Sequence, residues 1–550
     1  MGLSSAGIGS GLDVQSLVAS LVSAEITPRQ KLHDAKLNTI NTQLSAVGQL
    51  KSSLANLQTT LAGLSDISKL YTLKPTISDE SYLSVNLNNS SATTGTYQIE
   101  VQKMAQAQNV ASLPFTTSSS GGELIINFGT YNSDKSTFIA NNTDNTANPD
   151  FKMTVNPGDS LVAIKDAINN KKAGVTANII QDNNGSRLTL TSTNGENHSM
   201  QISGVDELTY NPTSTNPSDN KLIETIRAQN SVTNINGLIL TQNSNELENV
   251  ISGVTISLKQ AQTGKNITVT IAPDKMELTN LINDFVKKYN DSLTFLNSLT
   301  NYDSATKKSG TYMADSQLRN LKLNMNKLAT NTLSANNTSS IQSLADLGIT
   351  TNNTTGLLDI NTSQLETALT SNYNDIGGLF AKTALTSDAN VRINTLDQGV
   401  KAGTYDITIT QYIPTLSGTI GGFPATSSDG ITLTGSGDLK GISIDVLSGT
   451  DLARGTIKVT DGFAVQLNSF LDEYMSTDGN LSQKTLQLNE QIKQLAESQT
   501  KIDARGKTLE SRYLKQFSAL DVLVSQMQAT SSYLTQQLDN LPGFTDKSRK

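Results

Sequence analysis

The chain has 550 residues, more than one hydrophobic core usually holds, so several domains are expected. Its net charge of -8 at pH 7 argues against nucleic acid and anionic membrane surfaces as main partners. The absence of cysteine excludes disulfide bonds and thiolate metal sites. There is no run of about 18 apolar residues, so no segment is expected to span a membrane.

The first part of the chain predicts a flexible leader followed by helices. Residues 2–11 are small and Gly-rich, and this region lacks the basic and apolar segments of an ordinary secretory signal. Asp13 is a candidate N-cap for a helix whose apolar stripe starts at Val14. Pro28 should end or kink this helix, and a second helix is expected over about residues 30–64.

The two ends of the chain carry matching helical stripes. Apolar residues return every three or four positions, which places them along one side of a helix. They are Leu37, Ile40, Leu44, Val47, Leu50, Leu54, Leu57, Leu61 and Leu64, and then Leu481, Leu488, Ile492, Leu495, Ile502, Leu509, Tyr513, Leu520, Leu523, Met527, Leu534 and Leu538. A long helix cannot bury one apolar stripe alone, and each end offers the other a partner. The sequence therefore predicts a helical stalk built from both termini.

Between these ends, alternation of apolar and polar residues predicts strands. The clearest runs are Leu83 to Leu87, Tyr97 to Val101, Val175 to Ile179, Leu188 to Leu190, Val254 to Leu258 and Ile267 to Ile271. Residues 183–185, Asn-Asn-Gly, and residues 236–237, Asn-Gly, predict hairpin turns, because Asn and Gly tolerate positive φ. Asp159 or Ser160 is expected to cap a short helix.

Helical periodicity then returns and is interrupted once more. Two helices are expected over about residues 278–296 and 318–328, and Ser363 with Glu366 is a candidate capping box. Gly-rich alternation over about residues 386–464 predicts a further sheet.

A short motif occurs twice. Gly403 to Ile409 echo Gly95 to Val101, and both runs read Gly-Thr-Tyr-x-Ile-x-Ile or Val. Each run lies on a predicted strand that opens a sheet region. We interpret the echo as a repeated module.

The residues that carry most enzyme chemistry are sparse. The chain has two histidines, His33 and His198, and neither has a His or Cys partner at ligand spacing, so both are predicted to be solvated surface residues. There is no G-x-S-x-G elbow, no EF-hand spacing, and the glycines of residues 7–11 do not form a dinucleotide fingerprint. No catalytic residue, cofactor or metal site is therefore predicted, although a pair of glycosidase carboxylates has no diagnostic spacing and stays open.

The helical stripes are assigned partly to the core and partly to interfaces. Residues 37–64 and 481–515, with the helix at 278–296, are expected to cover one another. Residues 12–26 and 516–541 lie beyond this stalk and are expected to cover only each other. Full burial of a leucine is worth roughly 1.5–3 kcal/mol, whereas ordering one residue costs roughly 1–2 kcal/mol of backbone entropy. Neighbouring copies of the chain would therefore be needed to order these end helices.

With these residues in view, the chain closely resembles the bacterial flagellar filament cap family, also called the hook-associated protein 2 family. The resemblance covers both ends and most of the centre. The motifs that carry it are Gly7-Ile8-Gly9-Ser10-Gly11-Leu12-Asp13 with Leu17, Leu21 and Glu25; Ala163 to Asn169; Leu344-Ala345-Asp346-Leu347-Gly348-Ile349-Thr350; and Arg512 to Asp521 with Ser531 to Leu538.

The resemblance implies a structural protein that forms a homo-oligomeric ring at the distal, extracellular tip of the flagellum. Members of the family leave the cell unfolded by the flagellar type III route. Their terminal helices are legs that engage the filament end, while their sheet domains form a plate that holds flagellin as it folds and inserts. The leg role, at the oligomer and filament interface, carries over to Leu17, Leu21, Tyr513, Phe517, Leu520, Leu534 and Leu538. Further implied partners are a hook–filament junction protein and an export chaperone; nucleic acid and membrane are not implied.

The predicted fold class is α+β and multidomain, with a coiled-coil or bundle stalk from both termini and β-rich domains inserted between them. The predicted parts are terminal leg helices at 1–36 and 516–550, flexible before assembly; a helical stalk domain at 37–72, 274–385 and 465–515; a β domain at 73–105 and 230–273; a β-rich outer domain with one short helix at 106–229; and an inserted Gly-rich β domain at 386–464. Shorter family members lack this insert, and binding of a host glycan is an open role for it.

Two other functions fit the same pattern. One is another axial component, such as a hook–filament junction protein or a phage-tail adhesin with a helical stalk and a sheet head. The other is a secreted adhesive or polysaccharide-active protein whose sheet domains do the work. Labelling along the filament would favour the first, and glycan binding or turnover would favour the second.

Overall fold

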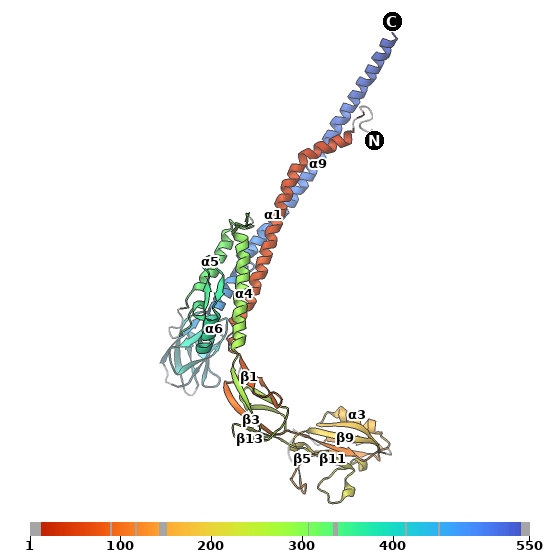
Figure 1. Cartoon of the computed structure of the whole chain (residues 1–550), viewed down its shortest axis with the longest axis vertical. Coiled ribbons are helices and arrows are strands. Elements are labelled where there is room, and N and C mark those ends of the chain that lie inside the picture. Colours follow the sequence, from red (N-terminus) through yellow and green to blue (C-terminus); the bar gives the residue numbers. More distant parts are fainter. Residues whose placement is uncertain are drawn as a thin grey trace. The chain divides into compact units, whose positions relative to one another are not determined.

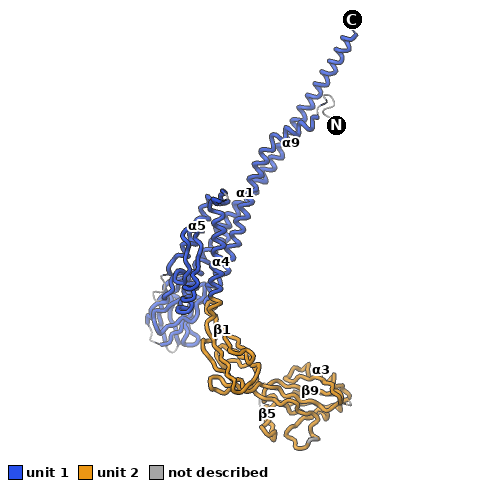
Figure 2. The backbone as a smooth tube through the Cα atoms, in the orientation of Figure 1, with its two compact units in different colours: residues 1–67, 279–550 blue, residues 68–278 orange. Residues whose placement is uncertain are grey.

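The computed structural model of the chain describes residue 11 and residues 13–88, 91–115, 118–141, 151–305, 307–333, 339–412, 415–448 and 452–540. The leader at residues 1–10 and the last residues, 541–550, lie outside this part of the chain. The chain divides into two compact units, shown in Figure 2. One unit comprises residues 1–67 and 279–550, and the other comprises residues 68–278.

Two long helices dominate the first unit, α1 (Val14–Leu64) and α9 (Asn480–Asp539). Figure 1 shows red α1 running alongside blue α9, as the sequence predicts. Asp13 caps α1, and its Oδ1 accepts a hydrogen bond of 3.0 Å from the Ser16 backbone N–H. Pro28 was expected to end or kink the helix; it does not end it, because α1 continues through it, so the expected second helix is part of α1. Glu25 and Gln30, on either side of Pro28, both contact α9, and the N-terminal part of α1 bends (Figure 1).

Shorter helices complete the stalk. They are α4 (Lys275–Thr300), α5 (Ser316–Thr330), α6 (Thr362–Ser371), α7 (Tyr373–Phe380) and α8 (Phe463–Met475). Phe285 and Tyr289 of α4 and Leu467 of α8 are fully buried, as are Leu54 and Leu57 of α1. The predicted capping box at Ser363 and Glu366 is wrong, because α6 begins earlier.

The cap of α6 is Asn361, whose Oδ1 accepts a hydrogen bond of 3.1 Å from the Gln364 backbone N–H. An asparagine satisfies the first free N–H groups of a helix as well as serine does. The candidate signal at Ser363 therefore falls inside the first turn.

The second unit contains a β module formed by two segments of the chain. Its strands are β1 (Leu73–Ile77), β2 (Leu83–Leu87), β3 (Gly95–Lys103), β12 (Ser231–Ile235), β13 (Leu238–Gln242), β14 (Glu246–Ile251), β15 (Val254–Leu258) and β16 (Asn266–Pro273). They form sheets of order β1-β16-β3-β12-β13 and β14-β15-β2. The predicted turn between β12 and β13 is confirmed: Asn236 has φ of 51° and Gly237 of 90°, as a tight hairpin requires.

The β3–β12 connection carries an outer β-rich part with its own core. Its elements are β4 (Ala107–Ser112), β5 (Gly122–Tyr131), β6 (Phe138–Ala140), β7 (Phe151–Val155), α3 (Leu161–Lys171), β8 (Val175–Asp182), β9 (Gly185–Asn194), β10 (Ser199–Ser203) and β11 (Leu222–Ile226). Ser160 caps α3, which buries Ile164 and Ile168 in this core. The predicted hairpin at residues 183–185 joins β8 to β9.

A second β module lies within the first unit, between α7 and α8. Its strands are β21 (Thr383–Thr386), β22 (Val391–Leu396), β23 (Gly403–Gln411), β24 (Ser417–Ile420), β25 (Phe423–Thr426), β26 (Thr432–Thr434), β27 (Ile442–Val446) and β28 (Leu452–Thr460). They form one sheet of order β21-β28-β23-β24-β25-β26-β27-β22.

The two modules are copies of one fold. Strand for strand, the order of the second sheet repeats the order of the two sheets of the first module, with one added pairing between β25 and β26 that joins the halves. The registers agree as well, because Gly95 pairs with Ile271 and Gly403 pairs with Val459. In each copy the last strand leads directly into a stalk helix, α4 or α8. The repeated module inferred from the Gly-Thr-Tyr echo is therefore present in the fold.

The second module is rooted on the stalk by aromatic and charged contacts. Phe380 and Phe463 flank it in sequence, and their rings pack on Phe285 of α4 at centroid distances of 6.4 and 5.4 Å. Lys382 Nζ lies 2.9 Å from Asp461 Oδ1 where the chain enters and leaves the module. These contacts attach the module to the helices on both of its connections.

Candidate functional site: the terminal helices

The seam between α1 and α9 follows a seven-residue repeat, which is the repeat of a coiled coil. The α9 side is formed by Leu481, Leu488, Leu495, Ile502 and Leu509, and the α1 side by Ile26, His33, Ile40, Val47, Leu54 and Leu61. The deep end of this seam is fully buried, because α4 and α8 also cover it. Further along, only the two helices cover each other, and Leu495 and Ile502 are half-buried, whereas Leu509 is buried again.

Polar pairs fix the register of this outer half. The side-chain amides of Gln30 and Gln499 exchange hydrogen bonds of 2.8 and 2.9 Å across the seam. Arg505 forms an ion pair with Glu25, and this hydrogen bond lowers the pKa of the Glu25 carboxyl. Polar pairs at a coiled-coil interface disfavour other registers, because a slip would leave each amide without its partner.

His33 lies inside the seam, so the prediction that it is a solvated surface residue is wrong. Its side chain is only 8% exposed. Nε2 lies 2.9 Å from the Leu495 carbonyl oxygen, and Nδ1 lies 3.2 Å from Asp34 Oδ1. The hydrogen bond to Leu495 and then that to Asp34 raise the pKa of His33. His198 is half-buried and sets its ring edge against Phe128, so it too is less solvated than predicted.

Beyond the seam, α9 presents an uncovered apolar stripe, which we call the α9 tail stripe. It comprises Leu520, Leu523, Met527, Leu534 and Leu538. Their exposure runs from 47% for Leu520 to 67% for Leu538. Leu523 continues the repeat of Leu481 to Leu509, and Leu520, Met527 and Leu534 follow Gln499 and Gly506, which also face α1, in steps of seven. The α1 helix begins at Val14 and does not reach these positions. The stripe is therefore the largest apolar helix face left open among the described residues of α9.

The structure places the seven predicted leg residues in three settings. Leu520, Leu534 and Leu538 belong to the α9 tail stripe. Tyr513 and Phe517 are half-buried on α9 near the start of α1. Leu17 and Leu21 are each 40% exposed on α1. The geometry brings these residues to one end of the helix pair but does not join them into one patch.

One expectation about the ends is wrong. Residues 12–26 and 516–541 were predicted to cover only each other, whereas the described part of the first segment packs on α9 before residue 516. Glu25 meets Arg505, and Ile26 lies against Gly506. Helical spacing in the sequence gives the stripe of each helix but not the register between them, which the polar pairs determine.

A groove lies along one flank of this helix pair. It has a volume of about 730 Å³ and is lined by one face of α1 from Gln15 to Lys31, with Glu510 and Leu514 of α9. Ala19, Val22 and Ile26 supply apolar floor. Sequence periodicity gave no signal for this groove, because its lining mixes apolar and polar residues.

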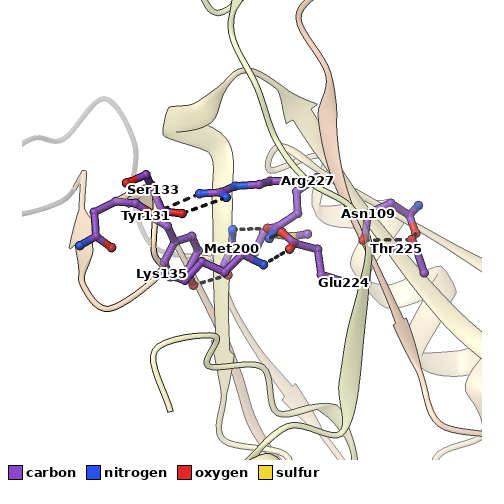
Figure 3. A network of polar contacts seen from close by, with 10 residues as sticks. Asn109, Tyr131, Ser133, Lys135, Met200, Glu224, Thr225 and Arg227 are labelled. Carbon is purple, nitrogen blue, oxygen red and sulfur yellow. Dashed lines mark hydrogen bonds and ion pairs between the residues drawn. The ribbon is translucent and has the colours of Figure 1, made fainter. Parts of the chain in front are cut away.

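A network of charged and polar side chains lies in the outer β-rich part, and its members are engaged with one another. As Figure 3 shows, Lys135 pairs with Glu224, and Tyr131 donates to the Met200 carbonyl at 2.8 Å. Gln108 also donates to Glu224 at 2.8 Å. Burial raises the pKa of Tyr131 above its usual value of 10, which keeps the hydroxyl protonated. The network joins the turn after β5 to β11. The Glu224 carboxylate already contacts Lys135 and Gln108, so we assign the network a structural role.

The residues that the structure describes contain neither a metal-binding cluster nor a membrane-spanning helix. No cluster of three or more His, Asp or Glu side chains there is arranged to hold a metal ion. No helix there has the length and apolar character to cross a membrane.

Comparison with known families identifies the chain. A family model described as flagellar hook-associated protein 2 C-terminus matches residues 228–529, and the corresponding N-terminus model matches residues 10–108. The chain belongs to the flagellar hook-associated protein 2 family. Within it, residues 137–194 match a motif described as flagellin hook IN. The resemblance read from the sequence motifs is confirmed.

Relatives in this family match the chain from end to end. Flagellar hook-associated protein 2 of Escherichia coli K12 is 28% identical, and the A-type protein of Pseudomonas aeruginosa is 26% identical, each over 98% of both chains. A crystal structure of the flagellar cap protein FliD from Escherichia coli, domains D1-D2-D3, matches 80% of this chain and 99% of that chain, with 26% identity and a TM-score of 0.50. The predicted fold class, with long terminal helices flanking β-rich domains, is confirmed.

Proposed function

We propose that this hook-associated protein 2 family member caps the distal end of the flagellar filament and promotes folding and insertion of exported flagellin. The family match supports this role. The observation that carries it in this chain is the α9 tail stripe, a coiled-coil face extending past the helix that would cover it. Such a face suits a protein that completes its packing only in an assembly.

The terminal helices act as legs in this proposal. Leu520, Leu534 and Leu538 contact neighbouring subunits or the filament end, and their exposure supports that role. Tyr513 and Phe517 lie where α9 leaves α1 and position the tail. Leu17 and Leu21 supply an apolar contact on α1. The legs gain full order on assembly, when a partner helix buries the stripe.

The sheet domains form the plate. The β module at 73–105 and 230–273 carries the outer domain at 106–229, and we assign these parts to closing the lumen and holding flagellin. The second module at 386–464 repeats the first and adds a further plate element. We leave binding of a host glycan open as an additional role of this module.

The cap works outside the cell as a homo-oligomeric ring. We propose export by the flagellar type III route, with an export chaperone inside the cell and a hook–filament junction protein as a further partner. A stalk whose folding depends on pairing the two ends of the chain fits a protein that folds after export.

The other functions are less well supported. An adhesin or a different axial component would not account for matches to both halves of the hook-associated protein 2 family. An enzyme is not supported, because the family is a structural cap family.

The test removes the apolar character of the α9 tail stripe in the producing bacterium. Leu523→Gln, Met527→Gln and Leu534→Gln together keep good helix formers but replace three of the five apolar side chains of the stripe. We expect short filaments and flagellin released into the medium. The matched control changes the opposite face, Ser525→Gln with Ser532→Gln, and should assemble full-length filaments. Full-length filaments without leakage in the stripe variant, exported at the normal level, would contradict the proposal.

A further inference from the structure

The groove on the flank of the helix pair combines an apolar floor with polar edges. Ala19, Val22 and Ile26 of α1 and Leu514 of α9 form its apolar floor. Polar side chains stand along it, among them Lys31 and Glu510. A third amphipathic helix can pack in a groove that has an apolar floor and polar edges and lies between two helices, here α1 and α9. From Gln15 to Lys31 the groove is roughly 24 Å long at the rise of an α-helix.

Within the part of the chain that the structure describes, α9 also has a segment of matching size whose apolar stripe is exposed. From Leu520 to Leu538 the α9 tail stripe is roughly 27 Å long. It is continuous with the seam between α1 and α9, so it has the geometry of a packing face. The α1 helix stops short of it because Asp13 caps its first turn and Gly11 has φ of +70°. Residues 2–11 carry no stripe that would extend the seam.

We propose that the groove between Gln15 and Lys31 receives the α9 tail, residues 519–539, of a second copy of this chain. The apolar floor covers Leu523 and Met527 of the incoming helix. The incoming segment is nearly uncharged, because residues 519–539 contain Asp521 and Asp539 and no Lys or Arg, and the charged lining of the groove is balanced between Lys31 and Glu510. This inference rests on the proposed cap function only in requiring that several copies assemble.

The same chain does not supply its own tail to its own groove. The tail is the uninterrupted continuation of α9, which ends at Asp539 and extends beyond the start of α1 (Figure 1). Folding it back would break the helix after Leu514. Donor and acceptor are therefore two different patches on different copies. An interface of this kind is heterologous, so repeating it generates a ring or an open array.

The test uses the absence of cysteine in the chain, which makes every introduced thiol unique. One purified full-length protein carries Ala19→Cys in the groove, and a second carries Met527→Cys in the tail. The two are mixed and oxidised under conditions where the protein is oligomeric. The control for the groove is Ala24→Cys, an exposed alanine on the opposite side of α1. A disulfide forms only where the two backbones lie within about 7 Å.

The proposal predicts a mixed disulfide dimer of Ala19→Cys with Met527→Cys in at least fivefold excess over the Ala24→Cys pairing. Disulfides mainly between two Met527→Cys chains would overturn it in favour of tails that pair with each other. Oligomers without any mixed disulfide would overturn it in favour of another occupant, such as a flagellin helix. Failure of this contact can be distinguished from failure of the cap function. Filament growth with the unmodified protein tests capping, and the crosslink tests only the contact between groove and tail.

Discussion

At the scale of single residues, His33 is the most informative position in the stalk. Its two ring nitrogens both face oxygen acceptors, the Leu495 carbonyl and the Asp34 carboxylate. A neutral imidazole donates from one nitrogen only, so the protonated ring satisfies both contacts. Asp503 of α9 adds favourable charge nearby. The histidine thus joins the two ends of the chain most strongly when it is charged.

This geometry predicts that the stalk weakens as pH rises. The folded-state pKa of His33 is raised, so its contribution is fully present below the unfolded pKa of about 6.5 and is lost as pH rises through the folded value. The free energy of unfolding of the full chain should therefore fall over this window, and that fall should vanish in His33→Gln.

The chain has an internal control for this measurement, because His198 is its only other histidine. In an NMR titration, one imidazole should show a pKa above 6.5 and disappear from the spectrum of His33→Gln. A His33 signal that titrates at or below 6.5, with stability independent of pH, would contradict the account.

At the scale of elements, the sequence predicts helices and hairpins better than it predicts their partners. The seven-residue repeat from Leu481 to Leu509 reports burial on one side of a helix, and that signal is local. The register of α1 on α9 depends on contacts such as Gln30 with Gln499, which are 469 positions apart and leave no local pattern. The continuation through Pro28 has the same origin, since tertiary contacts override a local preference.

The second module makes a prediction at this scale. Its first and last strands pair directly, with Thr383 opposite Thr460, so the module enters and leaves the stalk at one point. Replacing residues 383–460 by a Gly-Ser-Gly link should leave the helical stalk folded. Circular dichroism at 222 nm should show the helical signal unfolding within a few degrees of the full chain.

The matched variant changes a residue that attaches the module to the stalk and leaves the module itself unchanged. Phe463→Ala removes a buried ring that packs on Phe285 and Phe380, and should cost about 3–5 kcal/mol of unfolding free energy. If deletion of the module unfolds the stalk while Phe463→Ala has little effect, the module is part of the stalk core, contrary to this account.

At the scale of the whole molecule, duplication explains much of the architecture. The two modules share strand order and register, yet the sequence reveals this only through Gly95 to Val101 and Gly403 to Ile409. In both copies a Cβ added at the glycine would lie 3.2 Å from Cζ of the tyrosine, so a larger residue in place of Gly95 or Gly403 would crowd the ring. Elsewhere a β fold accepts many residues at each inward position, so the copies have diverged.

The assembly role follows from the two ends of the molecule and not from a reactive site. The family resemblance was visible in short motifs near both termini, and the stripe from Leu520 to Leu538 was predicted from its spacing. The flank groove was not, because it exists only once α1 and α9 are aligned. Sequence patterns therefore predict the family, whereas the surfaces through which the protein can assemble are seen only in the structure.

The most direct test of capping is the position of the protein on the flagellum. An epitope carried on the chain and detected with gold-labelled antibody in electron micrographs would report that position on intact filaments. We predict label at the distal end of each filament and nowhere along the shaft. Label distributed along the shaft, or confined to the junction with the hook, would contradict the cap function.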